Sequence, residues 1–318
     1  MNTFNCIFPQ IIPGDDLEIY DLPDIDFRPV TDADISLLEY YFKAYPARSC
    51  DFTIGGVLIW AEYYNYQIAV IKDTLIIKGT LPDSDTSIFY APIGAMDSEE
   101  YCEIIRNYCR IKGMHGYILE PTEIEPSDTG DGRPTQQGII QGMTEYLYNI
   151  EKFINFPGKK MEKKRNHLNF FNREYNDIEI EEINQSLSSQ MISFTIAFGA
   201  THDDEVADYE ARNIIDSIRS YDKYPYYGIV LKQNGKVIGY TFGEAIGDTF
   251  VIHAEKGDIQ YRGIYQALAS KLAEAVKLKY PDIKYLNRED DMGFEHLRKS
   301  KLSYHPSLYI AKRLVKVP

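Results

Sequence analysis

The sequence predicts an α+β protein built from two similar halves, each with a mixed, mainly antiparallel sheet flanked by helices. In both halves, short apolar runs precede a long helical pattern, which is followed by a strand and by a further helix and strand. The second half also contains Asn234-Gly235 between two apolar runs, and this dipeptide is typical of a tight β-hairpin turn because both positions adopt positive φ. The chain of 318 residues is long enough for each half to bury a core of its own.

The first half begins with a predicted helix and continues with short strands, a second helix and a strand. These elements are expected at 32–43 (helix), 53–60, 67–71, 74–78 and 87–92 (strands), 98–112 (helix) and 116–120 (strand). Residues 126–134 are rich in turn-forming residues and predict a loop. A short helix and a strand at 144–149 complete this half.

The second half repeats this order more clearly. Its elements are expected at 185–198 and 203–220 (helices), 226–232, 237–244 and 249–254 (strands), 262–279 (helix), 284–287 (strand), 292–300 (helix) and 308–314 (strand). Antiparallel strands followed by helix, strand, helix and strand is the order of the GNAT-type N-acyltransferase fold, and here it occurs twice. We therefore expect a GNAT-like domain over 1–150, a basic helix and linker over 151–184, and a second GNAT-like domain over 185–318.

The overall charge and composition exclude several classes of protein. The formal net charge is −14, which argues against a general nucleic-acid binder and against a protein that coats anionic membranes. The N-terminus lacks the features of a signal peptide, and no apolar run approaches the ~18 residues of a membrane span. We therefore expect a cytoplasmic protein without a transmembrane segment. The cysteines and histidines show no metal-ligand spacing, so no metal is predicted.

One segment departs from this acidic balance. Within residues 158–173, Met161, Leu168 and Phe171 recur at helical spacing, which predicts an amphipathic helix with its lysines on the opposite side. Such a helix gives an acidic protein a local anion site, although the same pattern also fits a plain solvated face. The basic side chains that we expect to contact a nucleic acid are Lys159, Lys160, Lys163, Lys164 and Arg165.

A second block of charged residues begins where the strand predicted at 284–287 ends. The run Asn287–Asp291 holds five polar residues, three of them acidic, and is therefore not expected in a core. Arg298 and Lys301 follow within one helical turn of each other, and Tyr304 lies three residues after Lys301.

This second block can supply the groups that acyl transfer requires. Transfer to an amine needs a group that orients the nucleophile, donors that face the developing oxyanion, and a proton source for the leaving group. Glu289 or Asp290 can orient the nucleophile. Lys301 can face the oxyanion, and Tyr304 can provide the proton.

Four motifs in these blocks and between them carry a resemblance to a known family. They are Lys163-Lys-Arg-Asn-His-Leu-Asn169, Tyr261-Arg-Gly-Ile-Tyr-Gln-Ala267, Asn287-Arg-Glu-Asp-Asp-Met-Gly293 and Leu297-Arg-Lys-Ser-Lys-Leu-Ser-Tyr-His-Pro306. They resemble a bacterial family formerly of unknown function that is related to the C-terminal domain of phosphatidylglycerol lysyltransferase. The resemblance implies two GNAT-like domains that share a cleft, as in the Fem-type peptidoglycan ligases. It also implies that an amino acid is moved from charged tRNA to an amine or a lipid hydroxyl.

The resemblance and the chemistry of the residues together assign roles to individual residues. The residues assigned to catalysis are Asp258, Glu289, Lys301 and Tyr304. Those assigned to substrate binding are Arg262, Gly263, Arg288, Asp290, Arg298 and His305. The basic helix is expected to touch the acceptor end of the tRNA, since phosphate contacts from Lys and Arg dominate such binding.

Two other functions remain open from the sequence. The first is an acyl-CoA-dependent N-acyltransferase, in which the backbone N–H groups of a Q/R-x-x-G-x-G/A turn hold the pyrophosphate. Gln260 and Gly263 fit that turn, whereas the bulky Tyr265 stands where a minimal side chain lets the phosphate approach. The second is a non-catalytic binding protein with the same fold. No tightly bound cofactor is expected: the co-substrate is aminoacyl-tRNA or acyl-CoA, and the acceptor is a lipid, a peptide or a small molecule.

Overall fold

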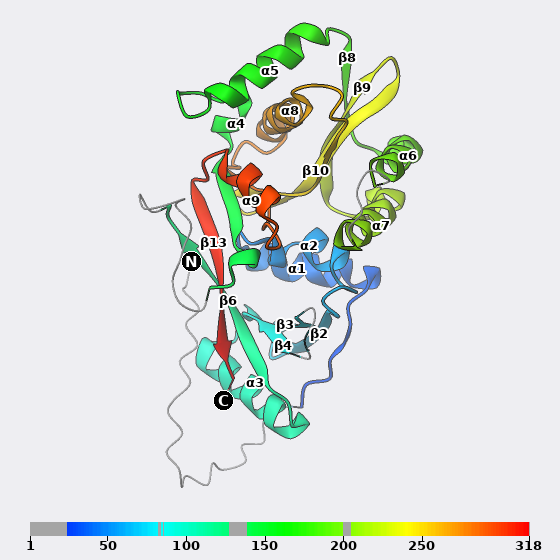
Figure 1. Cartoon of the computed structure of the whole chain (residues 1–318). Helices are drawn as coiled ribbons and strands as arrows, with labels where there is room; N and C mark the ends of the chain where they lie inside the picture. The colour runs from blue at the N-terminus through cyan, green and yellow to red at the C-terminus, as the bar shows by residue number, and fades with distance from the viewer. Residues whose placement is uncertain (1–23, 82–83, 85, 127–138, 200–204, 318) are drawn as a thin grey trace.

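A single sheet runs through both halves of the protein (Figure 1). The computed structural model describes residues 24–81, 84, 86–126, 139–199 and 205–317. The strands in this part of the chain are β1 (Arg28–Pro29), β2 (Gln67–Ile71), β3 (Thr74–Thr80), β4 (Ser87–Tyr90), β5 (Ile93–Gly94), β6 (Gly116–Ile124), β7 (Glu145–Asn149), β8 (Ile178–Glu182), β9 (Tyr226–Gln233), β10 (Lys236–Ile246), β11 (Thr249–Gly257), β12 (Tyr285–Asn287) and β13 (Leu308–Lys316). Their order in the sheet is β1-β2-β3-β4-β6-β13-β7-β12-β11-β10-β9-β8, and β5 pairs with β3 beside that path.

Helices pack against both faces of this sheet. The α-helices in the described residues are α1 (Ile35–Ala44), α2 (Ile54–Ile59), α3 (Ser98–Lys112), α4 (Glu151–Asn155), α5 (Glu162–Glu174), α6 (Ser188–Gly199), α7 (Glu205–Arg219), α8 (Ile264–Lys279) and α9 (Glu295–Leu302). The short 3₁₀ helices are η1 (Asp32–Asp34), η2 (Cys50–Phe52), η3 (Gln141–Met143), η4 (Gln185–Leu187) and η5 (Tyr221–Lys223).

In the first half, the sheet lies between α3 on one face and α1 and α2 on the other (Figure 1). The side chains of β3 alternate between these layers: Leu75 and Ile77 belong to the cluster with α1 and α2, and Ile76 belongs to the cluster with α3. Because successive residues of a strand point to opposite faces, a strand covered on both faces has an apolar centre, which in β3 is Leu75–Ile77.

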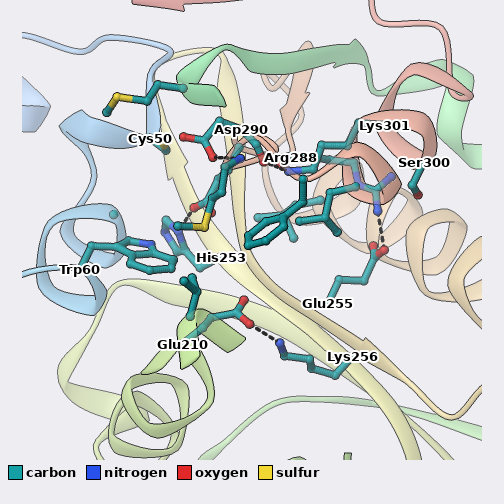
Figure 2. Close-up of a pocket in the computed structure, with 18 of the residues that line it drawn as sticks. Cys50, Trp60, Glu210, His253, Glu255, Lys256, Arg288, Asp290, Ser300 and Lys301 are labelled. Atoms are coloured by element: carbon teal, nitrogen blue, oxygen red, sulfur yellow. Dashed lines mark hydrogen bonds and ion pairs between the residues drawn. The ribbon is translucent and has the colours of Figure 1, made fainter. Parts of the chain in front are cut away.

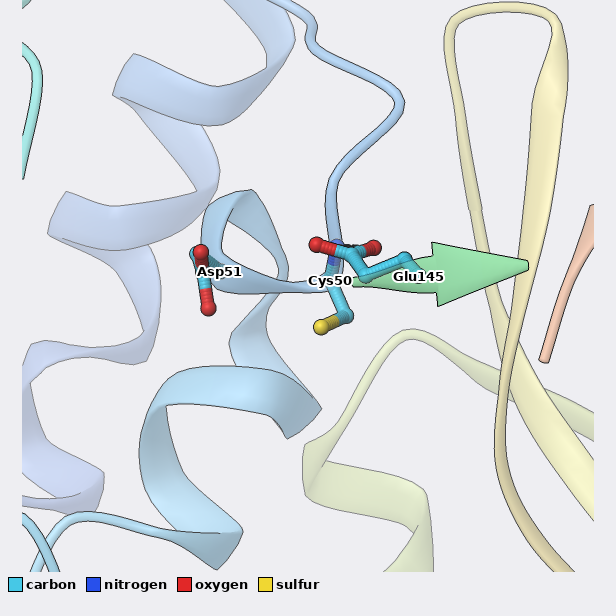
Figure 3. Close-up of side chains that lie close together, drawn as sticks. All are labelled: Cys50, Asp51 and Glu145. Carbon is cyan, nitrogen blue, oxygen red and sulfur yellow. Dashed lines mark hydrogen bonds between the residues drawn. The ribbon is translucent and has the colours of Figure 1, made fainter. Parts of the chain in front are cut away.

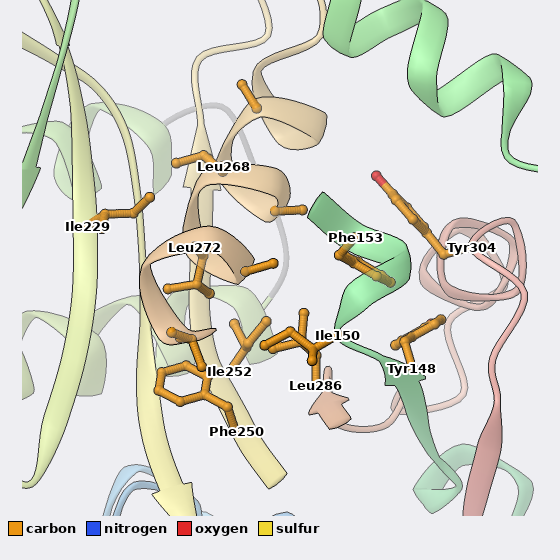
Figure 4. Close-up of a cluster of buried hydrophobic side chains, with 14 of the residues drawn as sticks. Tyr148, Ile150, Phe153, Ile229, Phe250, Ile252, Leu268, Leu272, Leu286 and Tyr304 are labelled. Atoms are coloured by element: carbon orange, nitrogen blue, oxygen red, sulfur yellow. The ribbon is translucent and has the colours of Figure 1, made fainter. Parts of the chain in front are cut away.

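In the second half, α8 packs on one face of the sheet and α6 and α7 pack on the other. Ile229 and Leu231 of β9 join Leu268 and Leu272 of α8 in one core, in which Figure 4 shows the α8 side chains directed at the strands. Val230 points the opposite way and packs in the cluster beneath α6 and α7.

The two halves exchange strands at the centre of the sheet. β13, which follows every other described strand in the chain, lies between β6 and β7, and β7 in turn pairs with β12. Tyr309 of β13 is thus the register partner of both Ile124 of β6 and Tyr146 of β7. Because the sheet is continuous, the division into domains over 1–150 and 185–318, with a linker over 151–184, stays a prediction.

Most predicted elements are present in the structure. The strand expected at 67–71 and the helix expected at 98–112 have the predicted bounds. The hairpin turn is confirmed: Asn234 and Gly235 join β9 to β10 with φ angles of 51° and 72°. Of the loop expected at 126–134, residues after Pro126 lie outside the described part of the chain, and η3 and β7 follow it as expected.

Several elements differ from the predictions, and β1 and α4 have no counterpart among them. The strand expected at 53–60 is wrong, because this segment forms α2, preceded by η2. Thr53 Oγ1 accepts the Gly56 N–H at 3.0 Å and caps the helix, and a short apolar run alone cannot distinguish a buried strand from a buried helix. β8 has no counterpart among the predicted elements, and it forms one edge of the sheet.

Candidate active site

A cavity of about 810 Å³ is lined by side chains of both halves (Figure 2). Trp60 and Tyr64 come from the first half, and His253, Arg288 and Tyr304 come from the second. One lysine each from α5, α9 and β13 completes a wall that combines aromatic rings with ionisable groups. The size and the mixed lining are those of a site for a small molecule or for one end of a larger one.

The loop after β12 supplies much of the ionisable wall. Asn287 at the end of β12 is fully buried, and its Nδ2 donates to Glu145 Oε2 at 2.5 Å and to the Arg48 carbonyl at 2.7 Å. Its Oδ1 accepts the Glu289 N–H at 2.8 Å. These bonds fix the start of the loop against the first half of the chain.

Asp291 fixes the other end of the loop. It is fully buried and accepts hydrogen bonds from the Tyr146 hydroxyl at 2.6 Å and from Arg298 Nε and Nη2 at 3.0 Å each. The prediction that the run 287–291 lies outside the core is therefore wrong at both of its ends. Their burial is possible because hydrogen bonds and an ion pair offset the desolvation of the polar groups.

His253 on β11 bridges two carboxylates. Its Nδ1 lies 2.8 Å from Glu289 Oε1, and its Nε2 lies 2.8 Å from Glu244 Oε1. The ring is 1% exposed. Although burial opposes the charged imidazolium, the hydrogen bonds to Glu244 and Glu289 raise the pKa of His253 to about 9. The histidine is therefore a buried cation between two anions at neutral pH.

Arg288 and Glu255 form a half-used ion pair, in which one polar atom of each side chain is paired and another has no hydrogen-bond partner among the described residues. Arg288 Nη2 donates to Glu255 Oε1 at 2.6 Å, and their side chains are 13% and 8% exposed. The other two atoms, Arg288 Nη1 and Glu255 Oε2, are buried and have no hydrogen-bond partner among the described residues. Both residues line the cavity (Figure 2), and a bound molecule reaches the two unpaired atoms when the ion pair shifts to expose them.

Tyr304 is a buried ring with two cations close to it. Lys164 Nζ lies 3.8 Å from the ring centroid and Arg288 Cζ lies 4.9 Å from it. The hydroxyl accepts a hydrogen bond from Gln266 Nε2 at 2.7 Å. Burial, together with the charge of Arg288, lowers the pKa of Lys164 to about 8. Helix α5 therefore directs one of its lysines into the cavity, in contrast to the predicted arrangement with all of them on the outer face.

Lys301 holds the loop after β12 from the side of α9. Its Nζ donates to the carbonyl of Arg288 at 2.6 Å and to the carbonyl of Asp290. Burial lowers the pKa of Lys301 and raises the pKa of Asp290 to about 7. The structure thus gives Lys301 a positioning contact, and its action on an oxyanion stays a prediction.

A cluster of metal-ligand types lies beside the cavity, but its donors do not fit a metal. Ligand atoms of Cys50, Asp51 and Glu145 lie within 4.8 Å of one another (Figure 3). Lys312 Nζ contacts all three: it lies 2.7 Å from Asp51 Oδ2, 3.1 Å from Glu145 Oε1 and 4.0 Å from Cys50 Sγ. Although burial opposes the charged ammonium, these neighbours raise the pKa of Lys312 well above its usual range. The ammonium therefore supplies the positive charge that a metal ion would bring, and burial raises the pKa of Cys50, which keeps it a thiol.

The cavity brings together only part of the predicted site. The predicted residues that line it are Lys164, Arg288, Glu289, Asp290, Lys301 and Tyr304. Those that do not line it are Asp258, Arg262, Gly263, Arg298 and His305. The roles of both groups stay predictions.

The predicted residues outside the cavity lining have local contacts. Asp258 Oδ1 accepts a backbone N–H two residues further along at 2.9 Å. Arg262 Cζ lies 4.4 Å from the centroid of the Phe170 ring on α5. His305 Nε2 lies 3.2 Å from the carbonyl oxygen of Lys160.

Most of the basic segment is on the surface. Lys159, Lys160 and Lys163 are exposed, as a contact with a nucleic acid requires. Arg165 instead donates to two backbone carbonyls of the preceding turn, at 2.8 and 3.0 Å. Binding of a nucleic acid by this segment stays a prediction.

Several residues at the cavity have no counterpart among the predicted site residues. They are Trp60, Glu244, His253, Glu255 and Lys312. A signal was present for two of them, because Val251-Ile-His-Ala-Glu255 places a histidine and a glutamate in an otherwise apolar strand. Ionisable groups in a buried strand need partners and are common at functional sites.

Comparison with known families shows to which protein family the chain belongs. The sequence profile of the family described as "Phosphatidylglycerol lysyltransferase, C-terminal" matches residues 42–315. The chain belongs to the phosphatidylglycerol lysyltransferase C-terminal family. The matched span contains both halves and all residues that line the cavity.

Solved structures confirm the fold of this lysyltransferase C-terminal family in the chain. A conserved protein of unknown function from Bacteroides thetaiotaomicron is 26% identical, with 91% of this chain and 99% of that chain covered and a TM-score of 0.75. L-PGS from Bacillus licheniformis is 14% identical, with 88% and 90% covered and a TM-score of 0.58. FemX is 8% identical, with 90% and 96% covered and a TM-score of 0.54. The predicted α+β, GNAT-like architecture is thereby confirmed, and the family supports an aminoacyl or acyl transferase in general.

A further relative is an uncharacterized protein from Mycoplasmoides gallisepticum. It is 29% identical over 186 residues, which are 56% of this chain and 58% of that protein. The match therefore spans little more than half of the relative's length. Among the described residues of the present chain, no helix combines the length and the apolar character that crossing a membrane requires.

Proposed function

We propose that this chain transfers an aminoacyl group from charged tRNA to an amine or hydroxyl acceptor in the cavity. The observation that carries the proposal is the half-used ion pair of Arg288 and Glu255. An aminoacyl ester offers a carbonyl oxygen to Arg288 Nη1 and an α-ammonium to Glu255 Oε2, so it provides both buried atoms with partners. An acetyl group has only the carbonyl and leaves the carboxylate oxygen unpaired, which is unfavourable in a buried site.

The basic segment supports tRNA as the donor. Lys159, Lys160 and Lys163 are exposed, while Lys164 of the same segment reaches Tyr304 inside the cavity. The segment therefore connects a cationic surface to the site of reaction. Lysines that contact phosphates there can hold the acceptor end of a tRNA and leave its aminoacyl group at the cavity.

The start of α8 disfavours acyl-CoA as the donor. Gly263 precedes this helix with a φ of 93°, and a Cβ on it would lie 2.4 Å from the carbonyl oxygen of His167 on α5. A pyrophosphate bound at a helix start needs open N–H groups and positive potential. Here a carbonyl oxygen lies against the turn, and Tyr265 adds bulk at the first turn of the helix.

The proposed reaction is an acyl substitution. The nitrogen or oxygen of the acceptor attacks the ester carbonyl carbon, and the π electrons move to the carbonyl oxygen. The tetrahedral intermediate then re-forms the carbonyl, the bond to the ribose oxygen breaks, and the proton of the nucleophile passes to that oxygen. Arg288 and Lys164, which both line the cavity, supply positive charge for the oxyanion.

The test measures release of labelled amino acids from charged bulk tRNA by the full chain, with and without phosphatidylglycerol vesicles as acceptor. The wild type is expected to release the label. Glu255→Gln is expected to slow release by about 10- to 10²-fold, because the amide loses its charge-assisted bond to the α-ammonium. Glu181→Gln is the matched control, since Glu181 is 39% exposed and pairs with Lys232 away from the cavity.

A parallel titration with acetyl-CoA separates this function from its alternatives. Saturable binding of acetyl-CoA, without release of amino acids from tRNA, would replace the proposal by an acyl-CoA-dependent N-acyltransferase. Binding of charged tRNA with no release would indicate a non-catalytic binding protein. The proposal also requires that tRNA binding weakens with salt and on replacing Lys159, Lys160 and Lys163 by Gln.

A further inference from the structure

We propose that His253 is a positioning residue that holds the Glu289 carboxylate at the cavity wall, where Glu289 accepts the proton of the attacking nucleophile. The inference rests on the proposed transfer reaction and names the residue that prepares its base. His253 itself does not touch the substrate, because both of its ring nitrogens are occupied by carboxylates.

The geometry makes His253 a donor on both sides. Its two nitrogens each lie 2.8 Å from a carboxylate oxygen, and neither Glu244 nor Glu289 can donate in return while ionised. A ring that carries a proton on each nitrogen satisfies both contacts at once. The resulting order is anion, cation, anion, and the cation lies inside while Glu289 faces the cavity.

Glu244 gives this arrangement a fixed anchor. Its Oε1 also accepts the N–H of Gly55 at 2.6 Å, so α2 of the first half closes over the bridge. A Cβ on Gly55 would lie 2.4 Å from His253 Cδ2, which means that the backbone of α2 lies directly against the ring. The imidazole is therefore confined from this side as well as by its two hydrogen bonds.

Glu289 is held in an uncommon backbone conformation. Its φ is 55°, which residues other than glycine rarely adopt. Its backbone N–H donates to Asn287 Oδ1 at 2.8 Å. Its carbonyl oxygen accepts the Tyr146 N–H at 3.2 Å. Strained backbone that the surroundings impose is characteristic of functional sites. Here it directs a carboxylate, 20% exposed, toward the cavity.

In the step assigned to Glu289, the carboxylate takes up one proton and later gives the same proton away. As the nucleophile bonds to the carbonyl carbon, its proton moves to the carboxylate of Glu289. When the carbon–oxygen bond to the ribose breaks, the same proton moves to the departing ribose oxygen, and Glu289 is again ionised. The hydrogen bond from the neighbouring imidazolium fixes the orientation of the carboxylate before the attack.

The groups that face His253 define its pH dependence. Glu244 approaches from β10 and Glu289 from the loop after β12; the Tyr226 ring of β9 lies 5.7 Å away, and α2 contributes a backbone N–H to Glu244. With a pKa of about 9, His253 is charged below that pH and neutral above it. The enzymatic rate is therefore expected to fall as pH rises through about 9.

The first experiment observes the bridge directly, by ¹⁵N NMR of the full chain with labelled histidine between pH 6 and 10. One histidine is expected to keep both ring nitrogens protonated until about pH 9, and its signal should be absent in His253→Gln. Glu289→Gln, which keeps the side-chain size, should lower the midpoint of that histidine. A wild-type His253 that titrates near its ordinary value of about 6.5, or one unaffected by Glu289→Gln, would overturn the proposal.

The second experiment measures release of amino acids from charged bulk tRNA by the variants, after subtraction of spontaneous hydrolysis. Glu289→Gln is expected to lower kcat by about 10²-fold and His253→Gln by about 10-fold, both with KM unchanged. The double variant should be no slower than Glu289→Gln alone, since His253 acts only through that carboxylate. The wild type and His253→Gln should both lose rate near pH 8, where Lys164 loses its charge, and only the wild type should show a further fall near pH 9. His115→Gln, an exposed histidine in the first half, is the control.

The two experiments separate the failure of this inference from the failure of the proposed function. An active wild type with equal kcat in His253→Gln, or a double variant much slower than Glu289→Gln, would reject the positioning role alone. An inactive wild type would reject the transfer function, and the NMR titration would then decide whether the charged bridge exists.

Discussion

At the level of single residues, the protein buries ionisable groups where opposite charges surround them. Lys312 is 1% exposed and lies between Asp51 and Glu145, at 2.7 and 3.1 Å. Glu145 is further held by Asn287 and by the hydroxyl of Ser49 at 2.5 Å. Removing the ammonium would leave two buried carboxylates without an opposite charge. The free-energy cost of that loss is larger than the stabilisation that the intact ion pairs contribute.

Lys312→Met is therefore expected to lower the free energy of unfolding by about 3–5 kcal/mol. The measurement is urea-induced unfolding followed by the fluorescence of Trp60, the single tryptophan of the chain. Lys299→Met is the control, because Lys299 is exposed and its pair with Glu295 contributes at most about 1 kcal/mol. Equal unfolding midpoints for the two variants would contradict the prediction.

The sequence was informative about site residues that are neighbours in the chain. Arg288, Glu289 and Tyr304 could be predicted because they lie in polar motifs that follow a strand. Glu244 and Lys312 could not, because their relevance depends on contacts with residues far away in the sequence. The bond between Asn287 and Glu145, for example, joins positions 142 residues apart, and no local pattern indicates such a pair.

At the level of elements, α5 packs closely over the start of α8. This packing requires a glycine at position 263, since a Cβ there would meet a backbone carbonyl at 2.4 Å. Gly158, just before α5, also has positive φ, of 81°, but no atom lies within 4 Å of its Cβ position. Substitutions at these two glycines therefore distinguish two effects: Gly158 tests the backbone conformation alone, and Gly263 tests the conformation together with close packing.

Gly158→Ala is expected to destabilise the protein by about 1 kcal/mol, from the left-handed backbone alone. Gly263→Ala should cost a further 1–3 kcal/mol or so, because α5 must move away from α8. Thermal unfolding of both variants under the same conditions provides the comparison. If both lose the same stability, the two helices are not packed as closely as described.

Elements with local signals were predicted well. For α3, Asp97 accepts the N–H groups of Glu99 and Glu100 at the helix start, and Gly113 adopts a φ of 62° at its end. Both are short-range features that the sequence displays. The helix α2 was mistaken for a strand because its cap, Thr53, stands before an apolar run that suits either structure.

At the level of the whole molecule, the exchange of β7 and β13 joins both halves into one sheet. A fold with two independent domains would unfold in two steps, whereas a continuous sheet with a shared central strand is expected to unfold in one. The pairing of β6 with β13 connects distant parts of the chain, and neither strand contains a local signal for it. Sequence reasoning therefore found the two similar halves but not their connection.

The expected outcome is a single unfolding transition in urea. Trp60 reports on the first half, and the NMR signals of His253 report on the second. Their transitions should superimpose on each other and on the loss of far-ultraviolet circular dichroism. Separate midpoints for Trp60 and His253 would show that the halves unfold independently, despite the shared sheet.

The position of β13 has a consequence for synthesis of the protein. A ribosome makes this strand after every other described strand, yet its place is at the centre of the sheet, between β6 and β7. Until it emerges, β6 and β7 each have an open edge of unpaired backbone groups, and such edges readily pair with other chains. The nascent protein is therefore most prone to aggregation after β6 and β7 have been made and before β13, the strand that joins them, has emerged.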